Sequence, residues 1–459
     1  MEHFDVVVIG SGSGMIVASV AVDSGFKTAL IENGPMGGTC LNRGCVPSKI
    51  LIHPADLTTM IREADRLGIN AQVNSIVFSN IMERMREVVN EDSSSQQRAV
   101  EATPNLTWFR ETCEFTGDYT IQTGKQPITA EMIFIVSGAR PGIPPIKGIE
   151  NVDYLTSDTV LELERPPKSI IIMGGGYIGV EFGHFFAGIG TQTTIIQRPD
   201  RIMPNEEQEI SQLLKSELSK RMDIFTSHEA LEVNEANGVK TVKARNREDG
   251  TFKEFSAEAL MIAAGRVPNS DLLKPEKTGV KLDEHGFIKV DEYLETNKKR
   301  IWAFGDAIGK HMFKHVANYE AGIAWHNATH DHKVKMDYSV APHAVFTYPQ
   351  VATVGLKEEE ARQLGYKILI GKALYKDTAM GAALGKPEGF VKVIVENQTG
   401  RILGAHIIGP EASVLIQEVI NAMNTESRSF SSIARAMHIH PALNEVVQQA
   451  FGNLHEHAH

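Results

Sequence analysis

The stretch GGTCLNRGCVPSK, Gly37 to Lys49, contains two cysteines whose spacing suggests chemistry. Cys40 and Cys45 are two of only three cysteines among 459 residues. Such a pair is a structural disulfide, half of a metal site or a reactive dithiol. Three cysteines are too few for a disulfide framework, and a reducing compartment would not preserve a merely structural bridge. The first interpretation is therefore weakened.

A metal site is also disfavoured. Zinc needs further ligands nearby, but Cys113 stands alone, and His3 and His53 show no ligand spacing. The alternating histidines at the chain end, 455–459, indicate a mobile tail or a cloning remnant rather than a metal site. We therefore predict no metal, an inert Cys113 and a redox-active cysteine pair, which needs a bound electron carrier.

A first nucleotide-binding loop precedes the cysteines. Residues 3–33 predict a strand, a glycine turn, a helix and a second strand. Gly10 and Gly12 would place a pyrophosphate on the helix N-terminus, and Glu32 would reach a ribose hydroxyl. Met15 replaces the third glycine of the G-x-G-x-x-G pattern, and Gly14 lies one residue early. The phosphate-facing part of the pattern is intact, although a side chain at Met15 is expected to alter helix–strand packing.

A second unit of the same kind has the complete glycine pattern, at Gly174, Gly176 and Gly179. Its second strand ends in Gln197 and Arg198, where an NAD-binding unit is expected to have an acid. Because arginine can pair with a 2′-phosphate, this end favours NADP. The alternative is an exposed Arg198 in an enzyme that accepts either nucleotide.

The composition favours small-molecule partners. The chain is 42% hydrophobic and 22% charged, and its formal net charge of −11 without a long Lys/Arg run argues against nucleic acid or anionic membrane as a partner. We find no apolar run of membrane-spanning length and no basic leader before the first strand. A cytoplasmic location is expected.

The cysteine stretch resembles the redox-active signature of the class I pyridine nucleotide-disulfide oxidoreductases, which are flavoproteins. The resemblance extends over almost the whole chain. TNKKRIWAFGDAIG is similar to the family's second FAD-binding motif, MIAAGRVPN and FIVSGARP to its nucleotide-domain strand motifs, and HIHPALNEV to its active-site His-Pro motif. This resemblance to the family implies FAD and NADP or NAD as cofactors, a small thiol or disulfide substrate and a homodimer. Membership of a multienzyme complex is left open.

The resemblance also implies roles for single residues. Cys45 would face the flavin, and Cys40 would exchange with the substrate. His440, oriented by Glu445, would be the acid and base and would complete the site of the partner subunit. Further positions are Lys49, near the flavin and paired with Glu181, and the cofactor-binding residues Gly10, Gly12, Gly14, Glu32, Gly38, Thr39, Lys49, Gly138, Gly305, Asp306, Gly174, Gly176, Gly179, Arg198, Gly265 and Arg266. Asp306 would hydrogen-bond the ribityl chain.

The expected fold class is α/β, with two Rossmann-like dinucleotide-binding domains, for FAD and NAD(P)H, and a C-terminal α+β dimerisation domain. The FAD domain would comprise residues 1–152 and 278–338, the NAD(P)H domain residues 153–277, and the dimerisation domain residues 339–459. The Pro/Gly-rich stretch ARPGIPPIKG is the predicted linker after the first part.

Several activities are compatible with the resemblance. Dihydrolipoamide dehydrogenase is the broadest expectation, whereas KHVANYEA, HPALNE and the Gln197–Arg198 pair are closer to the NADP-using mycothione reductase branch. Mercuric reductase is disfavoured because residues 451–459 contain no cysteine. An NAD(P)H oxidase or quinone reductase and a non-catalytic flavin-binding subunit are the alternatives of other classes. The cysteine pair and His440 argue against both.

Overall fold

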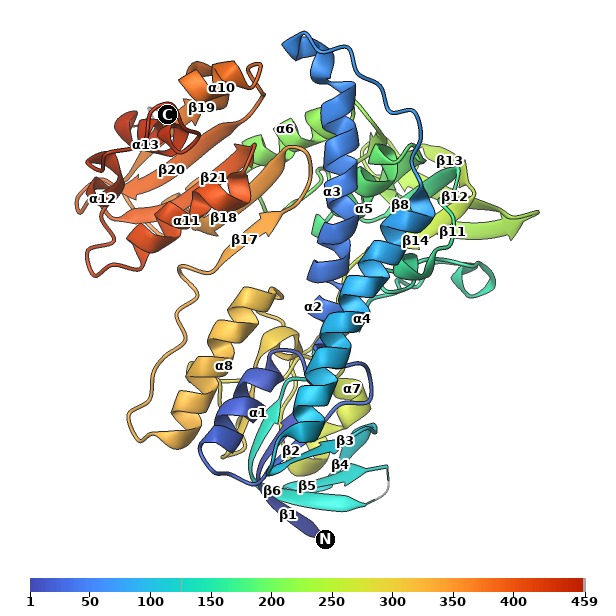
Figure 1. Cartoon of the computed structure of the whole chain (residues 1–459), viewed down its shortest axis with the longest axis vertical. Helices are drawn as coiled ribbons and strands as arrows, with labels where there is room; N and C mark the ends of the chain where they lie inside the picture. Colours follow the sequence, from blue (N-terminus) through green and yellow to red (C-terminus); the bar gives the residue numbers. More distant parts are fainter. Residues whose placement is uncertain (125, 457–459) are drawn as a thin grey trace.

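The computed structural model describes residues 1–124 and 126–456, and the chain forms three regions (Figure 1). The predicted tail histidines His457 and His459 lie outside the described residues. Among the described helices, none is long and apolar enough to cross a membrane. The α/β class and the presence of two units with the strand–glycine–helix–strand pattern are as predicted.

The first region, at the lower end of Figure 1, is a mostly parallel sheet covered by helices. Its strand order is β3-β2-β1-β6-β5-β4, and β16 pairs with β6, so the chain returns to this sheet after building the second region. Val7 and Phe134, on the central strands, are fully buried, as expected for a parallel sheet covered on both faces. The elements are β1 (Glu2–Ile9), α1 (Gly14–Asp23), β2 (Thr28–Ile31), α2 (Gly38–Arg43), α3 (Cys45–Arg62), η1 (Ala64–Leu67), α4 (Phe78–Ala102), β3 (Leu106–Phe109), β4 (Cys113–Gly117), β5 (Thr120–Thr123), β6 (Pro127–Ile135), β16 (Ile301–Ala303), η5 (Gly305–Ile308) and α8 (Lys314–Thr329).

The second region repeats the strand–glycine–helix–strand unit. Its parallel sheet has the order β10-β9-β8-β14, beside an antiparallel sheet of β11, β12 and β13. A short antiparallel pair, β7 with β15, connects the first and second regions. The elements are β7 (Ala139–Pro141), η2 (Ile149–Asn151), η3 (Thr159–Glu162), β8 (Ser169–Met173), α5 (Tyr177–Gly188), β9 (Gln192–Ile196), α6 (Gln208–Leu218), β10 (Asp223–Phe225), β11 (His228–Ala236), β12 (Val239–Asn246), β13 (Phe252–Ala257), β14 (Ala259–Ile262), β15 (Arg266–Pro268), α7 (Ser270–Leu273) and η4 (Pro275–Thr278).

The third region is an antiparallel sheet of order β17-β18-β21-β20-β19 with helices, the α+β texture predicted for the C-terminal part. α11 lies along β18 and β21 (Figure 1). The elements are β17 (Pro342–Val345), β18 (Gln350–Gly355), α9 (Glu358–Gln363), β19 (Ile368–Leu374), η6 (Tyr375–Asp377), α10 (Ala379–Ala383), β20 (Phe390–Glu396), β21 (Ile402–Gly409), α11 (Ala412–Met423), α12 (Ser431–Ala434) and α13 (Glu445–Gly452).

Long helices connect the regions. Figure 1 shows α3 and α4 running from the first sheet towards α5 of the second region. α3 and α5 approach so closely that a Cβ on Gly188 would lie 2.5 Å from Cβ of Ala55. Leu51, Phe182 and Phe185 belong to one shared hydrophobic core. The start of α3, where the cysteines lie, is therefore fixed relative to the second nucleotide unit.

A group of charges around the buried Lys392 connects the second and third regions. The ammonium of Lys392, on β20, lies 3.2 Å from Glu207, 3.1 Å from Glu209 and 2.8 Å from Glu358. Burial acts to raise the pKa of Glu358, but the hydrogen bonds and charges of Lys392 and Arg362 together outweigh it and hold that pKa below its usual range. The third region is thus connected to the residues just before and within α6 by specific ionic contacts.

Candidate active site

The cysteine segment lies directly against the first glycine loop. Gly38, the first residue of α2, has φ +64°, and a Cβ there would lie 2.6 Å from Cα of Gly12. Only glycine combines this left-handed backbone with so close an approach. α2 and α3 are separated by Gly44, where a Cβ would lie 3.0 Å from the carbonyl oxygen of Thr39. The glycines around the cysteines are therefore required by packing.

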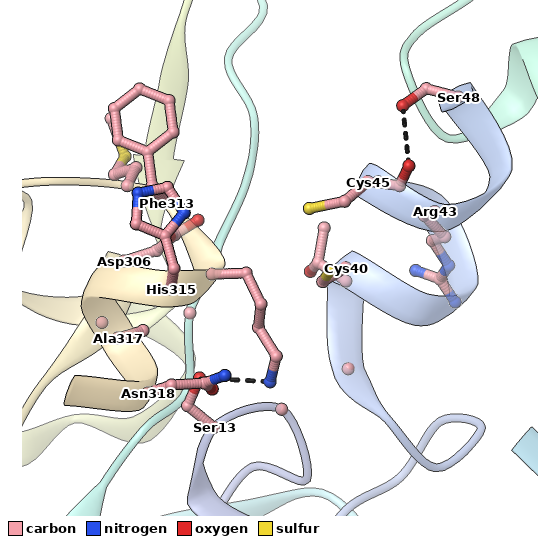
Figure 2. Close-up of a pocket in the computed structure, with 18 of the residues that line it drawn as sticks. Ser13, Cys40, Arg43, Cys45, Ser48, Asp306, Phe313, His315, Ala317 and Asn318 are labelled. Atoms are coloured by element: carbon pink, nitrogen blue, oxygen red, sulfur yellow. Dashed lines mark hydrogen bonds between the residues drawn. The ribbon is translucent and has the colours of Figure 1, made fainter. Parts of the chain in front are cut away.

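Cys40, in α2, and Cys45, the first residue of α3, line one cavity, opposite Phe313 and His315 (Figure 2). Both thiols are free in this structure. A hydrogen bond from Cys40, helped by the charge of Lys49 and opposed by burial, lowers the pKa of Cys45 to about 7. The hydrogen bond with Cys45, together with burial, raises the pKa of the Cys40 thiol. The pair therefore shares one proton, which stays on Cys40, and the thiolate forms at Cys45.

Lys49 and Glu181 form an ion pair beside the cysteines. The Lys49 ammonium lies 2.7 Å from Oε2 of Glu181, and 4.6 Å from the ring centroid of Phe346. Oε1 of Glu181 accepts a hydrogen bond of 2.9 Å from the backbone N–H of Phe346. Glu181 from the second region and Phe346 from the third therefore hold this ammonium in the cavity wall. Its role towards a cofactor stays a prediction.

The cavity has a volume of about 840 Å³ and extends from the cysteines to the first glycine loop. Glu32, at the end of β2, accepts hydrogen bonds from the backbone N–H and hydroxyl of Ser11 at 3.0 and 2.8 Å. The hydroxyl of Ser137 lines the cavity and, within the described structure, is buried without a hydrogen-bond partner. A dinucleotide such as FAD fits this arrangement, because it would offer a ribose to Glu32 and polar atoms to the free hydroxyl.

The glycines of the first loop let it pack closely against the neighbouring strands. Gly10 has φ +107°, and a Cβ there would lie 2.3 Å from the carbonyl oxygen of Val136. A Cβ on Gly14 would lie 2.8 Å from Cγ1 of Val8, so Gly14 provides the close packing of α1 on β1. The expected disturbance from Met15 is therefore not found, because the glycine one residue earlier makes the contact. Met15 packs on the core of the first region instead.

Asp306 lies where the chain leaves β16. Its Oδ2 is 3.5 Å from Nε of Arg266, and both side chains line the cavity. Burial raises the pKa of the Asp306 carboxyl, and the charge of Arg266 partly offsets that effect. The N–H of Gly305 donates to the buried Glu320 at 2.7 Å, which fixes the turn from within α8. The structure thus brings two predicted residues, Asp306 and Arg266, into direct contact.

The second glycine loop has the same construction as the first. Gly174 has φ +116°, and a Cβ on Gly179 would lie 1.9 Å from the carbonyl oxygen of Gly174. Oε1 of Gln197 accepts a hydrogen bond of 2.7 Å from the N–H of Gly175, as Glu32 does from Ser11 in the first unit. Gln197 therefore occupies, in the second unit, the position that Glu32 has in the first. Gly176 leads into α5.

The arginine after Gln197 is exposed and paired. Nε of Arg198 lies 3.1 Å from Oε1 of Glu229, whose other oxygen lies 3.1 Å from Arg245. Two arginines thus surround one carboxylate at the end of β9. The remaining predicted glycines, Gly138 and Gly265, have φ +69° and +127° and follow β6 and β14, at the turns out of the two parallel sheets.

His440 and Glu445 lie away from the cysteines. Nδ1 of His440 donates to Oε1 of Glu445 at 2.8 Å, and Oε2 accepts from the N–H of Ala442. The bond from His440 holds the pKa of Glu445 below its usual range. The His440 side chain is 71% exposed and does not line the cavity of its own chain. Within the described chain, this predicted pair is formed, but it is not brought to the cysteines.

A row of aromatic and basic residues was missed by sequence reasoning. Phe313 lies between His315 and His343, with ring centroids 5.8 and 5.2 Å away, and Tyr177 is 5.7 Å from it. Nε2 of His343 is 2.5 Å from the buried Glu206. Two signals in the sequence could have found part of this row: Tyr177 lies within the second glycine pattern, and His315 lies in KHVANYEA. His343 lies in a segment without a chemical pattern, and only folding brings these residues together.

The family of the chain follows from comparison with known proteins. The family model described as pyridine nucleotide-disulphide oxidoreductase matches residues 4–322, and the model of its dimerisation domain matches residues 341–451. The chain belongs to this family. FAD and NAD(P)H are therefore its cofactors, and the chain is a flavoprotein disulfide oxidoreductase.

Individual relatives within the family extend over nearly the whole chain. Mycothione reductase of Mycobacterium tuberculosis is 35% identical over 98% of this chain and 99% of its own. Dihydrolipoyl dehydrogenase of Bacillus subtilis is 31% identical over 98% and 97%. The structure of the HOCl-induced flavoprotein disulfide reductase RclA from Escherichia coli superposes with a TM-score of 0.86 at 28% identity, covering 98% of this chain and 99% of that one.

Among the described residues, no group of three or more His, Cys, Asp and Glu side chains is arranged to hold a metal ion.

Proposed function

We propose that this protein is an NADPH-dependent reductase of a low-molecular-weight disulfide, of the kind that mycothione reductase reduces. The observation that carries the proposal is the Cys40–Cys45 pair, which lies in the same cavity as the first glycine loop and has one proton between two sulfurs. A dithiol with one ready thiolate suits disulfide exchange.

The chemistry can be assigned to residues. FAD, when bound, passes two electrons from the nicotinamide nucleotide to the Cys40–Cys45 disulfide. In the resulting dithiol, Cys40 would lose its proton to the partner's His440 and attack one sulfur of the substrate. The first thiol then leaves with that proton. The Cys45 thiolate attacks the Cys40 sulfur, which restores the disulfide and releases the second half of the substrate as a thiolate that takes its proton from solvent. Lys49 would stabilise the thiolate of Cys45 until that thiolate attacks Cys40.

His440 suits the role of the base. Glu445 accepts from Nδ1, so the tautomer leaves Nε2 free to take a proton. Because the side chain is exposed on its own chain and the family has a dimerisation domain, we propose that a homodimer delivers it to the other subunit.

The preference for NADPH is proposed from the end of β9. An acid there would hydrogen-bond the 2′-hydroxyl of NAD and repel a 2′-phosphate, but Gln197 is neutral and satisfied by Gly175. Arg198 and Arg245 are both paired with Glu229, so a 2′-phosphate bound here would take the place of that carboxylate on the two guanidinium groups.

Arg198→Ala tests this preference. We expect KM for NADPH to rise about 10- to 100-fold, which is the effect of losing one charged hydrogen bond. The kcat with either nucleotide and the KM for NADH should stay nearly unchanged. Steady-state rates with both nucleotides measure it. An equal rise for NADH, or no rise for either, would contradict the preference.

The substrate is tested on the FAD-loaded enzyme with mycothione and glutathione disulfide, using NADPH and NADH in parallel. Fast NADPH oxidation with one of these disulfides is expected, and Cys45→Ser should abolish it. Full activity of that variant would sink the cysteine mechanism.

Dihydrolipoamide dehydrogenase is the second candidate, because curated relatives with that activity match at 31–34% identity. Oxidation of dihydrolipoamide with NAD and with NADP distinguishes the two. Fast turnover with NAD, together with no NADPH-driven reduction of the disulfides, would establish the second candidate.

A further inference from the structure

The cations that line the cavity differ in their partners. Arg43 lies 3.6 Å from Asp158, Lys49 is paired with Glu181, and Arg266 with Asp306. Lys314 is the exception among the described residues, since no carboxylate lies within ion-pair distance of it. Its burial lowers the pKa of the ammonium, while the charges of Cys40 and Cys45 act in the opposite direction. A desolvated cation without a negatively charged partner is costly, so the site calls for an anion.

The position of Lys314 indicates where that anion lies. Lys314 is the first residue of α8, and its ammonium donates to the hydroxyl of Ser13 at 3.2 Å. That hydroxyl donates in turn to Oδ1 of Asn318 at 2.9 Å, one turn further along α8. Ser13 belongs to the first glycine loop and immediately precedes α1. Figure 2 shows Ser13 and Asn318 together on the side of the cavity away from the cysteine helices.

We propose that Lys314 binds the pyrophosphate of FAD and completes the charge balance of the first glycine loop. The loop itself offers backbone N–H groups and the N-terminus of α1, but it has no basic side chain, whereas the pyrophosphate has two negative charges. An ammonium brought in from α8, about 300 residues later in the chain, supplies the missing charge. This inference rests on FAD occupying the first loop and is independent of the disulfide substrate.

The cysteine thiolate is the competing anion, because the Lys314 charge also acts on Cys40. Two observations favour the pyrophosphate. The hydrogen bond of Lys314 is to the glycine loop, and Lys49 already supplies a charge that lowers the pKa of Cys45. The two assignments predict different defects, in FAD retention or in thiol titration.

The test is the rate at which the holoenzyme releases FAD, measured by flavin fluorescence with an excess of an apo-flavoprotein as a trap. Lys314→Met should release FAD about 10- to 100-fold faster than wild type at low salt, the effect of one charged hydrogen bond. The difference should shrink as KCl is raised, because salt screens the ammonium–phosphate attraction. Lys314→Arg should retain most of the slow release.

Lys310→Met is the matched control, since Lys310 is four residues earlier, exposed and outside the cavity lining. It should release FAD at the wild-type rate. Thermal unfolding with saturating FAD shows whether Lys314→Met folds, and Lys314→Gln serves if it does not. Wild-type FAD release in a folded variant, or faster release that salt does not change, would overturn the proposal. Disulfide reductase activity of the FAD-loaded enzyme is compatible with either outcome. Failure of this proposal would therefore leave the proposed function untouched.

Discussion

At the scale of the residue, the cysteine pair shows how contact creates reactivity. Both residues are cysteines with the same intrinsic acidity, yet they share one proton. The hydrogen bond between them raises the pKa of Cys40 and lowers the pKa of Cys45. Burial alone would raise both, as it raises the pKa of Cys113 to about 12. The hydrogen bond between the thiols and the nearby Lys49 decide which sulfur is the thiolate.

The titration of the cysteines tests this. With 13C-labelled cysteine β-carbons in the dithiol form of the holoenzyme, the Cys45 signal should titrate with a midpoint of about 7. Because that pKa is lowered from the usual thiol value, the thiolate is present above the midpoint and lost as the pH falls through it. The Cys113 signal should stay constant up to pH 10, since its pKa is about 12.

Lys49→Met removes the lowering charge and should move the Cys45 midpoint upwards. A Cys45 midpoint near that of an ordinary thiol in the wild-type protein would contradict the assignment of the thiolate.

At the scale of the element, glycines decide how closely helices and loops meet. α2 begins against the first glycine loop because neither Gly38 nor Gly12 has a side chain, and α5 packs on α3 at Gly188 for the same reason. These contacts bring the cysteine helices, the phosphate loop and the second unit to one cavity. Helix propensity has no part in this, since glycine is a poor helix former.

Gly38→Ala should damage both stability and FAD retention. Its Cβ would meet Cα of Gly12 at 2.6 Å on a backbone with φ +64°, so the loop must move. We expect a loss of about 1–3 kcal/mol in the free energy of unfolding and faster FAD release, measured by denaturant titration and flavin fluorescence.

Gly68→Ala is the matched control, because Gly68 has φ +79° and open space around its Cβ position. It should show only the smaller cost of the left-handed backbone and normal FAD release. Equal effects of the two substitutions would mean that the approach to Gly12 is not important.

At the scale of the whole molecule, one chain does not bring all the residues of the proposed site together. The cavity has the cysteines, the loops and Lys49, but His440 and Glu445 are formed elsewhere, with His440 exposed. The match of residues 341–451 to a dimerisation domain explains this arrangement if two chains exchange their histidines.

Hybrid dimers test the exchange. Cys45→Ser and His440→Gln should each be nearly inactive, but mixing the two and allowing subunits to exchange should restore about a quarter of wild-type activity, since half of the dimers are hybrids with one intact site. Steady-state disulfide reduction after unfolding and co-refolding measures it. If His440 served its own chain, the mixture would stay inactive, because no site would have both residues.

Much of the architecture could be predicted from local patterns. Both glycine loops, the strands on either side of them and the reactive nature of the cysteine stretch follow from residue type and spacing, because backbone conformation at glycine is a local property. Boundaries were less predictable. β17, for example, ends at Val345, and the N–H of the next residue, Phe346, donates to Glu181 on α5. That partner is distant in the sequence.

The sequence by itself determined the two nucleotide loops, the cysteine pair and the family to which they belong. Only the tertiary structure decided that Gly14 takes the packing role expected of the next position, that Asp306 meets Arg266, that Phe313 lies between two histidines, and that Lys314 reaches the first loop. The physical reason is that local geometry depends on neighbouring residues, whereas charge pairing and cavity walls depend on segments that meet only after folding.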